Sequence, residues 1–329
     1  MIITKTPIRI SLGAGPTDLP FFYRKYGARF ATCSGSKFVY VLVHPHPDKV
    51  VWTGLLHSER VNSADQLKNR IVNRVLQWMD LNRNIEVVSV SDAPPNSGLG
   101  NSSSFIVGLL KALHAYKGEF PWPQEIAEEA CYVEQKLLRE NSGKQDAYAA
   151  SLGGLIWLEI STNGKVDASR LNIQKTFVKS LSQALVFVDT GITRSSSEVQ
   201  GVHKARIESG DGAIEASLKE ISQIALDIRQ ALEHEDVHWF GRLTGRHWKI
   251  KSSMNPLIAD DRIRFIYEFA LKHGAIGGNL MGAGGGGHFM FVCQDKETAS
   301  QLSKAMTGKG LRLLDLRFEM QGSSLTERL

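Results

Sequence analysis

Cysteine is scarce in this 329-residue sequence, and its few copies are not arranged to pair. Cys33, Cys131 and Cys293 lie far apart and form no CxxC motif, which argues against a zinc site and a disulfide framework. Long hydrophobic runs are also missing. No run approaches the length of about 18 residues that a membrane span needs, and the N-terminal segment lacks the apolar region of a signal peptide. We therefore expect a reduced, cytoplasmic protein with no membrane partner.

The sequence has no cluster of positive charge, although it is basic overall. Lysine and arginine number 39 against 34 aspartates and glutamates, which gives a net charge of +5, and these basic residues are scattered. Nucleic-acid surfaces usually concentrate such residues. The pattern therefore argues against a nucleic-acid partner and favours a small anionic ligand. It indicates no particular oligomeric state.

Two widespread nucleotide-binding signatures are absent as well. No GxxxxGK[ST] sequence occurs, which excludes a Walker loop, and the GxGxxG match at residues 282–287 precedes a strand pattern rather than a helix. No internal repeat or low-complexity linker divides the chain. With 42% apolar and 22% charged residues, the composition is that of an ordinary globular protein, and the length favours two domains.

Hydrophobic periodicity predicts a chain of mixed strands and helices. Strands are expected at residues 2–12, 37–44, 49–52, 85–90, 154–160, 184–188, 288–293 and 311–319. Helices are expected at residues 64–79, from 105 to Gly118, at 124–138, between about 197 and 273, and at 296–307. The most polar stretch is 161–180, so we place a domain boundary there. This gives domains of residues 1–170 and 171–329.

Residues 94–104 place glycines and hydroxyls between a predicted strand and a predicted helix. Gly98 and Gly100 let the backbone approach a ligand closely, and the free N–H groups at a helix start attract an anion. The hydroxyls at 102–104 can cap the helix, bind phosphate or bind Mg²⁺. The segment therefore predicts a phosphate site. The alternative is an ordinary capped helix start, since Asn and Ser are good N-caps.

Two acidic residues differ from their surroundings. Glu134 shares a helix face with Ala127 and Ala130, where a carboxylate is unfavourable unless it is paired or bound to a metal. The alternative is a glutamate at the edge of the apolar stripe that reaches solvent. Asp146 is the only acid in the small-residue segment 142–154. It is a candidate for chemistry, and the alternative is a turn or helix-capping residue.

A second glycine-rich segment covers residues 282–287, directly before a predicted buried strand. Such a run can serve as a flexible hinge. Beside a buried strand, however, it is more often a place where a ligand contacts the backbone, and we favour that interpretation.

Taken in order along the chain, these segments resemble the GHMP small-molecule kinases, which include galactokinase, homoserine kinase, mevalonate kinase and phosphomevalonate kinase. The family pattern consists of P-x-[KR]-[IV], P-x-x-x-G-L-G-S-S and G-A-G-G-G. Here these read PIRI at 7–10, PPNSGLGNS at 94–102 and GAGGG at 282–286. Asn101 replaces the first serine of the usual pair. LGAGPTDLP at 12–20 replaces the usual Gly-Glu-His-x-Asp, and this variant is similar to the heptose 7-phosphate kinase branch and to fucokinases.

The resemblance implies an α+β fold of two domains, an N-terminal ribosomal-protein-like ATP-binding domain and a C-terminal ferredoxin-like domain, with the site between them. It implies a kinase that uses ATP and Mg²⁺ and phosphorylates the anomeric hydroxyl of D-glycero-D-manno-heptose 7-phosphate to the 1,7-bisphosphate. Such a product would serve capsule or lipopolysaccharide synthesis. A neutral sugar (fucose, galactose or mannose) is the alternative substrate, and a non-catalytic sugar sensor is the alternative class.

The resemblance also implies residue roles. Asp146 and Arg9 are the expected catalytic pair, and Ser102 and Glu134 the expected Mg²⁺ ligands. The ATP phosphates are expected at Pro94, Ser97, Gly98, Leu99, Gly100, Asn101, Ser102 and Ser103. The sugar phosphate is expected at Gly15, Thr17, Asp18, Lys37, Arg194, Gly284, Gly285 and Gly286. Within that set, Lys37 and Arg194 are chosen as cations that could bind the substrate's own phosphate.

Overall fold

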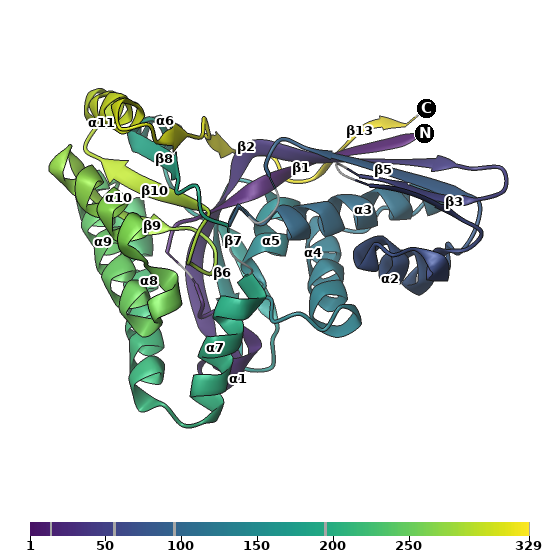
Figure 1. Ribbon diagram of the computed structural model, residues 1–329, viewed down its shortest axis with the longest axis horizontal. Helices are drawn as coiled ribbons and strands as arrows, with labels where there is room; N and C mark the ends of the chain where they lie inside the picture. Colours follow the sequence, from purple (N-terminus) through teal and green to yellow (C-terminus); the bar gives the residue numbers. More distant parts are fainter. Residues whose placement is uncertain (14, 55–56, 95–96, 194–195, 329) are drawn as a thin grey trace.

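The computed structural model describes residues 1–13, 15–54, 57–94, 97–193 and 196–328. These residues form two β-sheets, in which most neighbouring strands are antiparallel (Figure 1). The larger sheet has the order β13-β1-β2-β5-β3-β4; β6 and β12 also pair with β2, and β7 pairs with β6. The smaller sheet has the order β11-β8-β10-β9. This arrangement of helices with largely antiparallel sheets confirms the expected α+β fold.

The larger sheet and its helices come mostly from the first half of the chain. Its strands are β1 (Ile2–Ser11), β2 (Ala28–Pro45), β3 (Val50–Thr53), β4 (Ser58–Val61), β5 (Ile85–Ser91), β6 (Leu155–Ile160), β7 (Val166–Arg170), β12 (Phe318–Glu319) and β13 (Ser324–Arg328). Its helices are α1 (Pro20–Tyr26), α2 (Arg70–Trp78), α3 (Asn101–Lys117), α4 (Pro123–Tyr132) and α5 (Gln145–Leu152). A 3-10 turn (Ala64–Gln66) precedes α2, and a π-helical turn (Val133–Leu137) follows α4.

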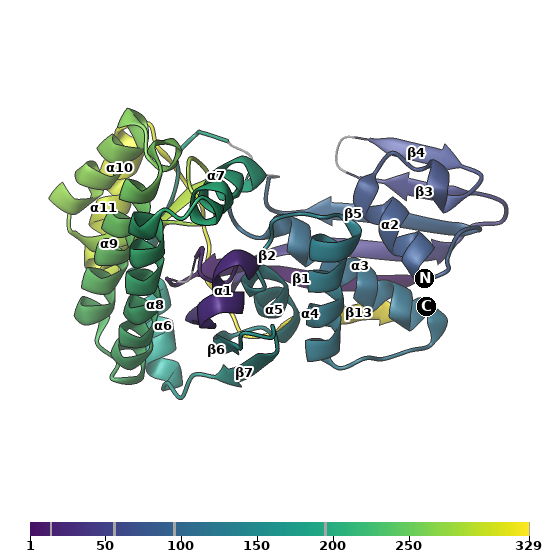
Figure 2. The same cartoon turned by 90° about the horizontal axis from the view of Figure 1, so that it is seen from below.

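The smaller sheet lies with the long helices of the second half (Figure 1), which Figure 2 shows gathered at one end of the molecule. Its strands are β8 (Leu185–Asp189), β9 (Ala275–Leu280), β10 (His288–Cys293) and β11 (Arg312–Leu313). The helices are α6 (Lys175–Ala184), α7 (Ser196–Glu208), α8 (Gly212–Glu233), α9 (Val237–Met254), α10 (Asp261–Lys272) and α11 (Lys296–Gly308), with a 3-10 turn (Pro256–Ile258) before α10. None of the described helices combines the length and hydrophobicity needed to cross a bilayer.

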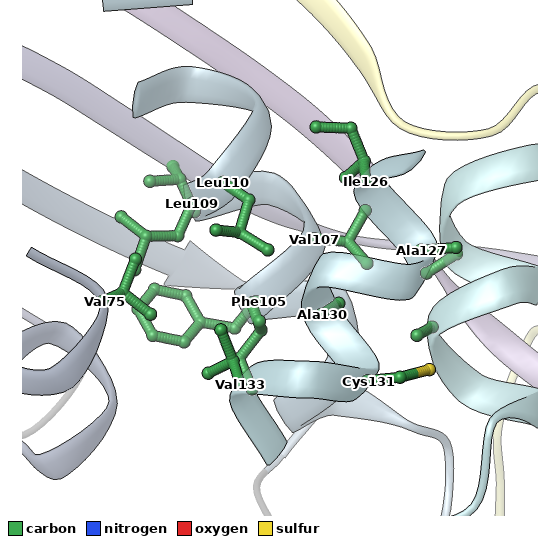
Figure 3. Close-up of a cluster of buried hydrophobic side chains, with 14 of the residues drawn as sticks. Val75, Phe105, Val107, Leu109, Leu110, Ile126, Ala127, Ala130, Cys131 and Val133 are labelled. Carbon is green, nitrogen blue, oxygen red and sulfur yellow. The ribbon is translucent and has the colours of Figure 1, made fainter. Parts of the chain in front are cut away.

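The larger sheet with helices α1–α5 forms the first lobe of the molecule, and the smaller sheet with helices α6–α11 forms the second lobe. Helix α3 is the central element of the first lobe. Its N-cap, Gly100, and the residue after its last turn, Gly118, both have left-handed backbone, which is why glycine begins and ends it. Between them most side chains are buried, so the hydrophobic pattern runs around the whole helix instead of along one stripe. Figure 3 shows Phe105, Leu109 and Val107 of α3 packed among side chains from α2 and α4.

The C-terminal segment returns to the first lobe. Strand β13 pairs with β1, β12 pairs with β2, and the Thr6 and Ser323 hydroxyls lie 2.8 Å apart. The division of the sheets therefore does not follow one cut in the sequence, and the boundary at 170/171 stays a prediction.

The expected helix 64–79 begins only at Arg70, because Asn69 caps it by accepting from the Val72 amide at 3.0 Å.

Candidate active site

A cavity of about 500 Å³ opens where the N-terminus of α3 meets the glycine-rich loop of residues 282–287. Elements from both lobes line it: the end of β1, the loop before α3, the π-helical turn, residues 138–146, α9 and the glycine-rich loop. The expected site residues that line it are Arg9, Gly15, Asp18, Ser97, Gly98, Gly100, Asn101, Ser102, Ser103, Glu134 and Asp146. The structure thus brings together residues that lie as far as 137 positions apart in the sequence.

Other expected residues do not line this cavity. Thr17 and Leu99 are buried in the protein, Pro94 is exposed, and Lys37 lies in β2 away from the cavity. Gly284 and Gly286 pack against Ile258 and Ile192, and the Gly285 amide donates to the Ile258 carbonyl at 3.0 Å. In their place, Gly282 and Ala283 line the cavity. Arg194 lies outside the described residues.

Arg9 connects residues 97–103, the predicted phosphate loop, to the expected catalytic acid. It comes from β1, only 4% of its side chain is exposed, and its Nε donates to Asp146 Oδ1 at 2.7 Å. Its Nη1 donates to the Gly98 carbonyl at 3.1 Å, and its backbone amide donates to the Leu99 carbonyl at 2.9 Å. One buried guanidinium therefore holds Asp146, at the start of α5, in a fixed place beside the loop that leads into α3.

The phosphate loop and the glycine-rich loop are in backbone contact. A Cβ on Gly98 would lie 2.8 Å from the Met281 carbonyl oxygen, and a Cβ on Gly282 would lie 2.9 Å from the Cα of Gly98. Both glycines have positive φ, at 73° and 74°. Only glycine allows this backbone conformation and this approach together. The free amides of the α3 N-terminus therefore open into a cavity walled by the other lobe, a suitable place for an anion.

Glu134 is buried against the phosphate loop, with 3% of the residue exposed. Its Oε1 accepts from Ser103 Oγ at 2.7 Å, and its buried Oε2 has no hydrogen-bond partner within the described residues. Burial raises the pKa of this carboxyl to about 8. An orphaned carboxylate oxygen beside a phosphate site fits Mg²⁺, which uses one or two protein carboxylates together with substrate phosphates. The hydroxyl against Glu134 belongs to Ser103, whereas Ser102 is exposed and lines the same cavity.

Asp18 is a second buried carboxyl in this cavity. It accepts from the Gln145 amide at 3.1 Å, and a Cβ on Gly143 would lie 1.9 Å from its Oδ2, so residues 143–145 enclose it closely. Burial, and after it the negative charge of Asp146, raise the pKa of Asp18 to about 6, while the Gln145 amide opposes this shift. The carboxyl lines the same cavity as the Arg9–Asp146 pair, where it can accept from a ligand's hydroxyl groups.

We expect Asp18→Asn to stabilise the free protein at pH 8 but not at pH 4. The folded state binds its proton more tightly than the unfolded chain, so the wild type loses stability as pH rises from about 4 to about 6. The asparagine variant has no such loss. Above pH 6 its free energy of unfolding should therefore exceed that of the wild type by an amount on the order of 1–3 kcal/mol. Urea unfolding at both pH values measures it, with Asp167→Asn in exposed β7 as the control. An equal effect at both pH values would contradict the assigned shift.

The sequence analysis missed several cations. Lys251 of α9 lines the cavity although it is buried, and Arg70 and Arg139 line the same cavity. A neighbouring hollow of about 560 Å³ shares these two arginines and adds Arg74 and Lys136, with no acidic residue among those that line it. The available signal for Lys251 was its helical spacing, because it follows buried His247 by four residues and precedes buried Met254 by three.

Comparisons with known proteins match both lobes. A family model for the GHMP kinases N terminal domain matches residues 66–154, and one for the GHMP kinases C terminal matches residues 228–311, together a little over half of the chain. A Campylobacter jejuni protein named D-glycero-alpha-D-manno-heptose 7-phosphate kinase is 28% identical, over 98% of this chain and 97% of the relative.

Solved structures agree on the fold. The structure of a D-glycero-D-manno-heptose 1-phosphate kinase from Bacteroides thetaiotaomicron superposes with a TM-score of 0.81 over all of both chains, at 22% identity. Lactococcus lactis galactokinase with bound galactose superposes with a TM-score of 0.79 over 98% of this chain and 94% of that chain, at 16% identity. At such identities, the likeness concerns the fold alone.

Proposed function

Because this chain belongs to the GHMP kinase family and is a sugar kinase, we propose that it transfers the γ-phosphoryl group of ATP to the anomeric hydroxyl of D-glycero-D-manno-heptose 7-phosphate. One observation carries the proposal: the Arg9–Asp146 pair, the N-terminus of α3 and the buried Glu134 share a single cavity. The Campylobacter jejuni relative, which aligns over 98% of this chain, supports the choice of sugar. The 1,7-bisphosphate formed in the cytoplasm would be a precursor for capsule or lipopolysaccharide.

The reaction needs positioning and charge neutralisation more than covalent catalysis. The sugar O1 forms a bond to the γ-phosphorus while the bond from that phosphorus to the β–γ bridging oxygen breaks, and ADP leaves. The O1 proton passes to the Asp146 carboxylate, and from there to water. Arg9 holds Asp146 in place through its 2.7 Å hydrogen bond, so the acceptor carboxylate is fixed before the substrate arrives.

The loop of residues 97–103 and the first turn of α3 provide hydroxyls and amides for the nucleotide's phosphates. Mg²⁺ held at Glu134, with the hydroxyl of Ser102 or Ser103 beside it, would supply the neutralisation of the triphosphate charge. The basic hollow that contains Arg70 and Arg139 is continuous with this site and is our candidate for the remainder of the nucleotide. Asp18 and Gly15 line the same cavity as the Arg9–Asp146 pair, and we assign them to the sugar.

We expect Glu134→Gln to weaken the apparent affinity for Mg²⁺ by roughly ten- to a hundredfold, the range seen when groups around a metal site are lost. The amide keeps an oxygen for Ser103 but removes the charge that the cation needs. Affinity for the sugar should change much less. The measurement is turnover as a function of Mg²⁺ concentration, together with the Mg²⁺-dependent rise in melting temperature in the presence of ADP. Glu140→Gln, at the rim of the same cavity, is the control. Overlapping titrations of Glu134→Gln and wild type would make Glu134 a structural residue.

A coupled assay of ADP release tests the proposed substrate. The purified protein receives heptose 7-phosphate, galactose, fucose or mannose with ATP and Mg²⁺, and we expect the highest kcat/KM with heptose 7-phosphate. A higher value for an unphosphorylated sugar would overturn the heptose-phosphate assignment in favour of the neutral-sugar alternative. Sugar binding without any ADP release would favour the sensor alternative.

The role of Arg194 at the substrate's phosphate stays a prediction, for which Arg194→Ala should raise KM for the sugar phosphate alone.

A further inference from the structure

Lys251 of α9 is a buried cation without an acidic partner among the described residues. Only 2% of the residue is exposed, yet it lines the active-site cavity. Its Nζ donates to the carbonyl oxygens of Leu280 at 2.7 Å and Gly282 at 2.6 Å. An ammonium group has three N–H donors, and these two neutral carbonyls use two of them. One donor and the positive charge therefore stay available to a ligand.

Lys251 lies close to the phosphate loop, because it binds a residue that contacts this loop. It holds Gly282, whose backbone contacts Gly98, and Arg9 donates to the carbonyl of Gly98. Two buried cations from different lobes therefore stand on either side of the contact between the two loops. Burial, and after it the charge of Arg9, lower the pKa of Lys251 to about 7, whereas Asp18 opposes this shift. Two basic groups are thus gathered where the phosphate loop meets the glycine-rich loop, and an anion bound there would favour the charged form of Lys251.

A purely structural role explains this arrangement poorly. Two carbonyl oxygens can be satisfied by a neutral amide, and burying a full charge beside another cation is unfavourable unless an anion compensates it. The nearby Asp18 forms no ion pair with Lys251 within the described residues. A site that binds phosphate would supply the missing anion, because the amides of α3 and the Arg9–Asp146 pair face the same cavity.

We propose that Lys251 donates a hydrogen bond to the phosphoryl group in transfer and is, with Arg9, a second protein cation of the kinase reaction. The inference rests on the proposed function. Lys251 neither gives nor takes a proton in the step: it stabilises the charge on the non-bridging oxygens while the bond to the sugar O1 forms and the bond to ADP breaks. The α9 lobe thereby contributes directly to chemistry whose other groups come mainly from the first lobe.

Three variants separate this role from a structural one. Lys251→Arg keeps the charge, Lys251→Gln keeps N–H donors for the two carbonyls without the charge, and Lys251→Met keeps neither. We expect kcat to fall on the order of a hundredfold in Lys251→Gln and Lys251→Met, as when an oxyanion donor is lost, and less in Lys251→Arg. KM for the sugar and for ATP should stay near the wild-type values. If Lys251 only held the carbonyls, Lys251→Gln would retain activity, and that result would overturn the proposal.

A binding measurement tests the same point without turnover. ADP with aluminium fluoride and Mg²⁺ mimics the phosphoryl group in transfer, whereas ADP with Mg²⁺ alone does not. We expect Lys251→Gln to weaken the fluoride complex on the order of a hundredfold and to leave ADP affinity nearly unchanged, because the contact belongs to the transferring group. Equal weakening of both complexes would overturn the proposal.

Two further outcomes distinguish a failure of the role inferred for Lys251 from a failure of the proposed function. A higher KM for heptose 7-phosphate with an unchanged KM for an unphosphorylated sugar would assign Lys251 to the substrate's own phosphate and overturn the present inference. Absence of ADP release by wild type with every sugar would overturn the proposed function. The comparison of the two ADP complexes would still decide the role of Lys251, because it requires no sugar.

Discussion

Replacing Asp146 with asparagine is expected to lower kcat by at least about a hundredfold, the lower end of the effect of a general base. Among the residues that the structure describes, the carboxylate is the only acidic group that Arg9 binds, and Arg9 in turn binds the phosphate loop. Asparagine keeps an oxygen that can accept from Arg9 Nε at the same place. The variant therefore removes the proton acceptor and its negative charge while it preserves most of the positioning.

Initial rates of ADP release at saturating ATP and sugar measure this effect, and the melting temperature reports whether the variant folds. Asp167→Asn, an exposed aspartate in β7, is the matched control and should turn over like the wild type. A folded Asp146→Asn variant with wild-type turnover would remove Asp146 from the mechanism. A large loss of kcat in Asp146→Asn with an unchanged KM for ATP would support the role of Asp146 at the acceptor hydroxyl.

Local sequence patterns predicted a large part of this site. A strand, a Gly-x-Gly turn and a hydroxyl-rich helix start are encoded within residues 85–104, and their geometry depends mainly on neighbouring residues. The helical spacing of Glu134 likewise predicted a carboxylate on an apolar face, and Glu134 is buried. Both inferences need only the periodicity of one element, which short-range interactions determine.

Contacts between distant segments could not be predicted in the same way. Lys37 was selected for its charge, but it lies in β2 and does not line the cavity, whereas Lys251 reaches the cavity from α9 through the packing of the second lobe. The glycines at 284–286 pack against the two isoleucines described above, and Gly282 and Ala283 line the cavity instead. Which residues of a loop face a cavity depends on tertiary packing, which one sequence does not display.

The buried groups of the site share an electrostatic property. Burial shifts the pKa of Asp18 to about 6, of Glu134 to about 8 and of Lys251 to about 7. Each shift means that the folded state disfavours the charged form of that group, and so each lowers stability near neutral pH. Such groups gather at functional sites because a ligand of opposite charge restores the balance. These three shifts therefore agree with the proposal that this cavity is the functional site.

The contact between the two loops supplies the second large effect. We expect Gly98→Ala to lower kcat/KM by about a hundredfold or more, the scale expected when reacting groups are misplaced by about 1 Å. The new Cβ would lie 2.8 Å from the Met281 carbonyl oxygen, which belongs to the backbone and has little freedom to yield. The phosphate loop or the glycine-rich loop must therefore shift, and with it the carbonyls that Arg9 and Lys251 bind.

Gly118→Ala is the matched control, because it separates this displacement from backbone strain. Gly118 also has positive φ, at 81°, but nothing lies within 4 Å of the place where its Cβ would be. Both variants should lose roughly 1–2 kcal/mol from the left-handed conformation, whereas only Gly98→Ala pushes the two loops apart. Urea unfolding should therefore show the shared strain in both variants, with a further loss of stability in Gly98→Ala from the forced shift. The kinetics of ADP release should show a large loss of activity in Gly98→Ala alone. If the two variants kept equal, wild-type kcat/KM, the loop contact would not control the alignment of the phosphate site. A loss confined to Gly98→Ala would instead show that close backbone approach between the lobes positions the reacting groups.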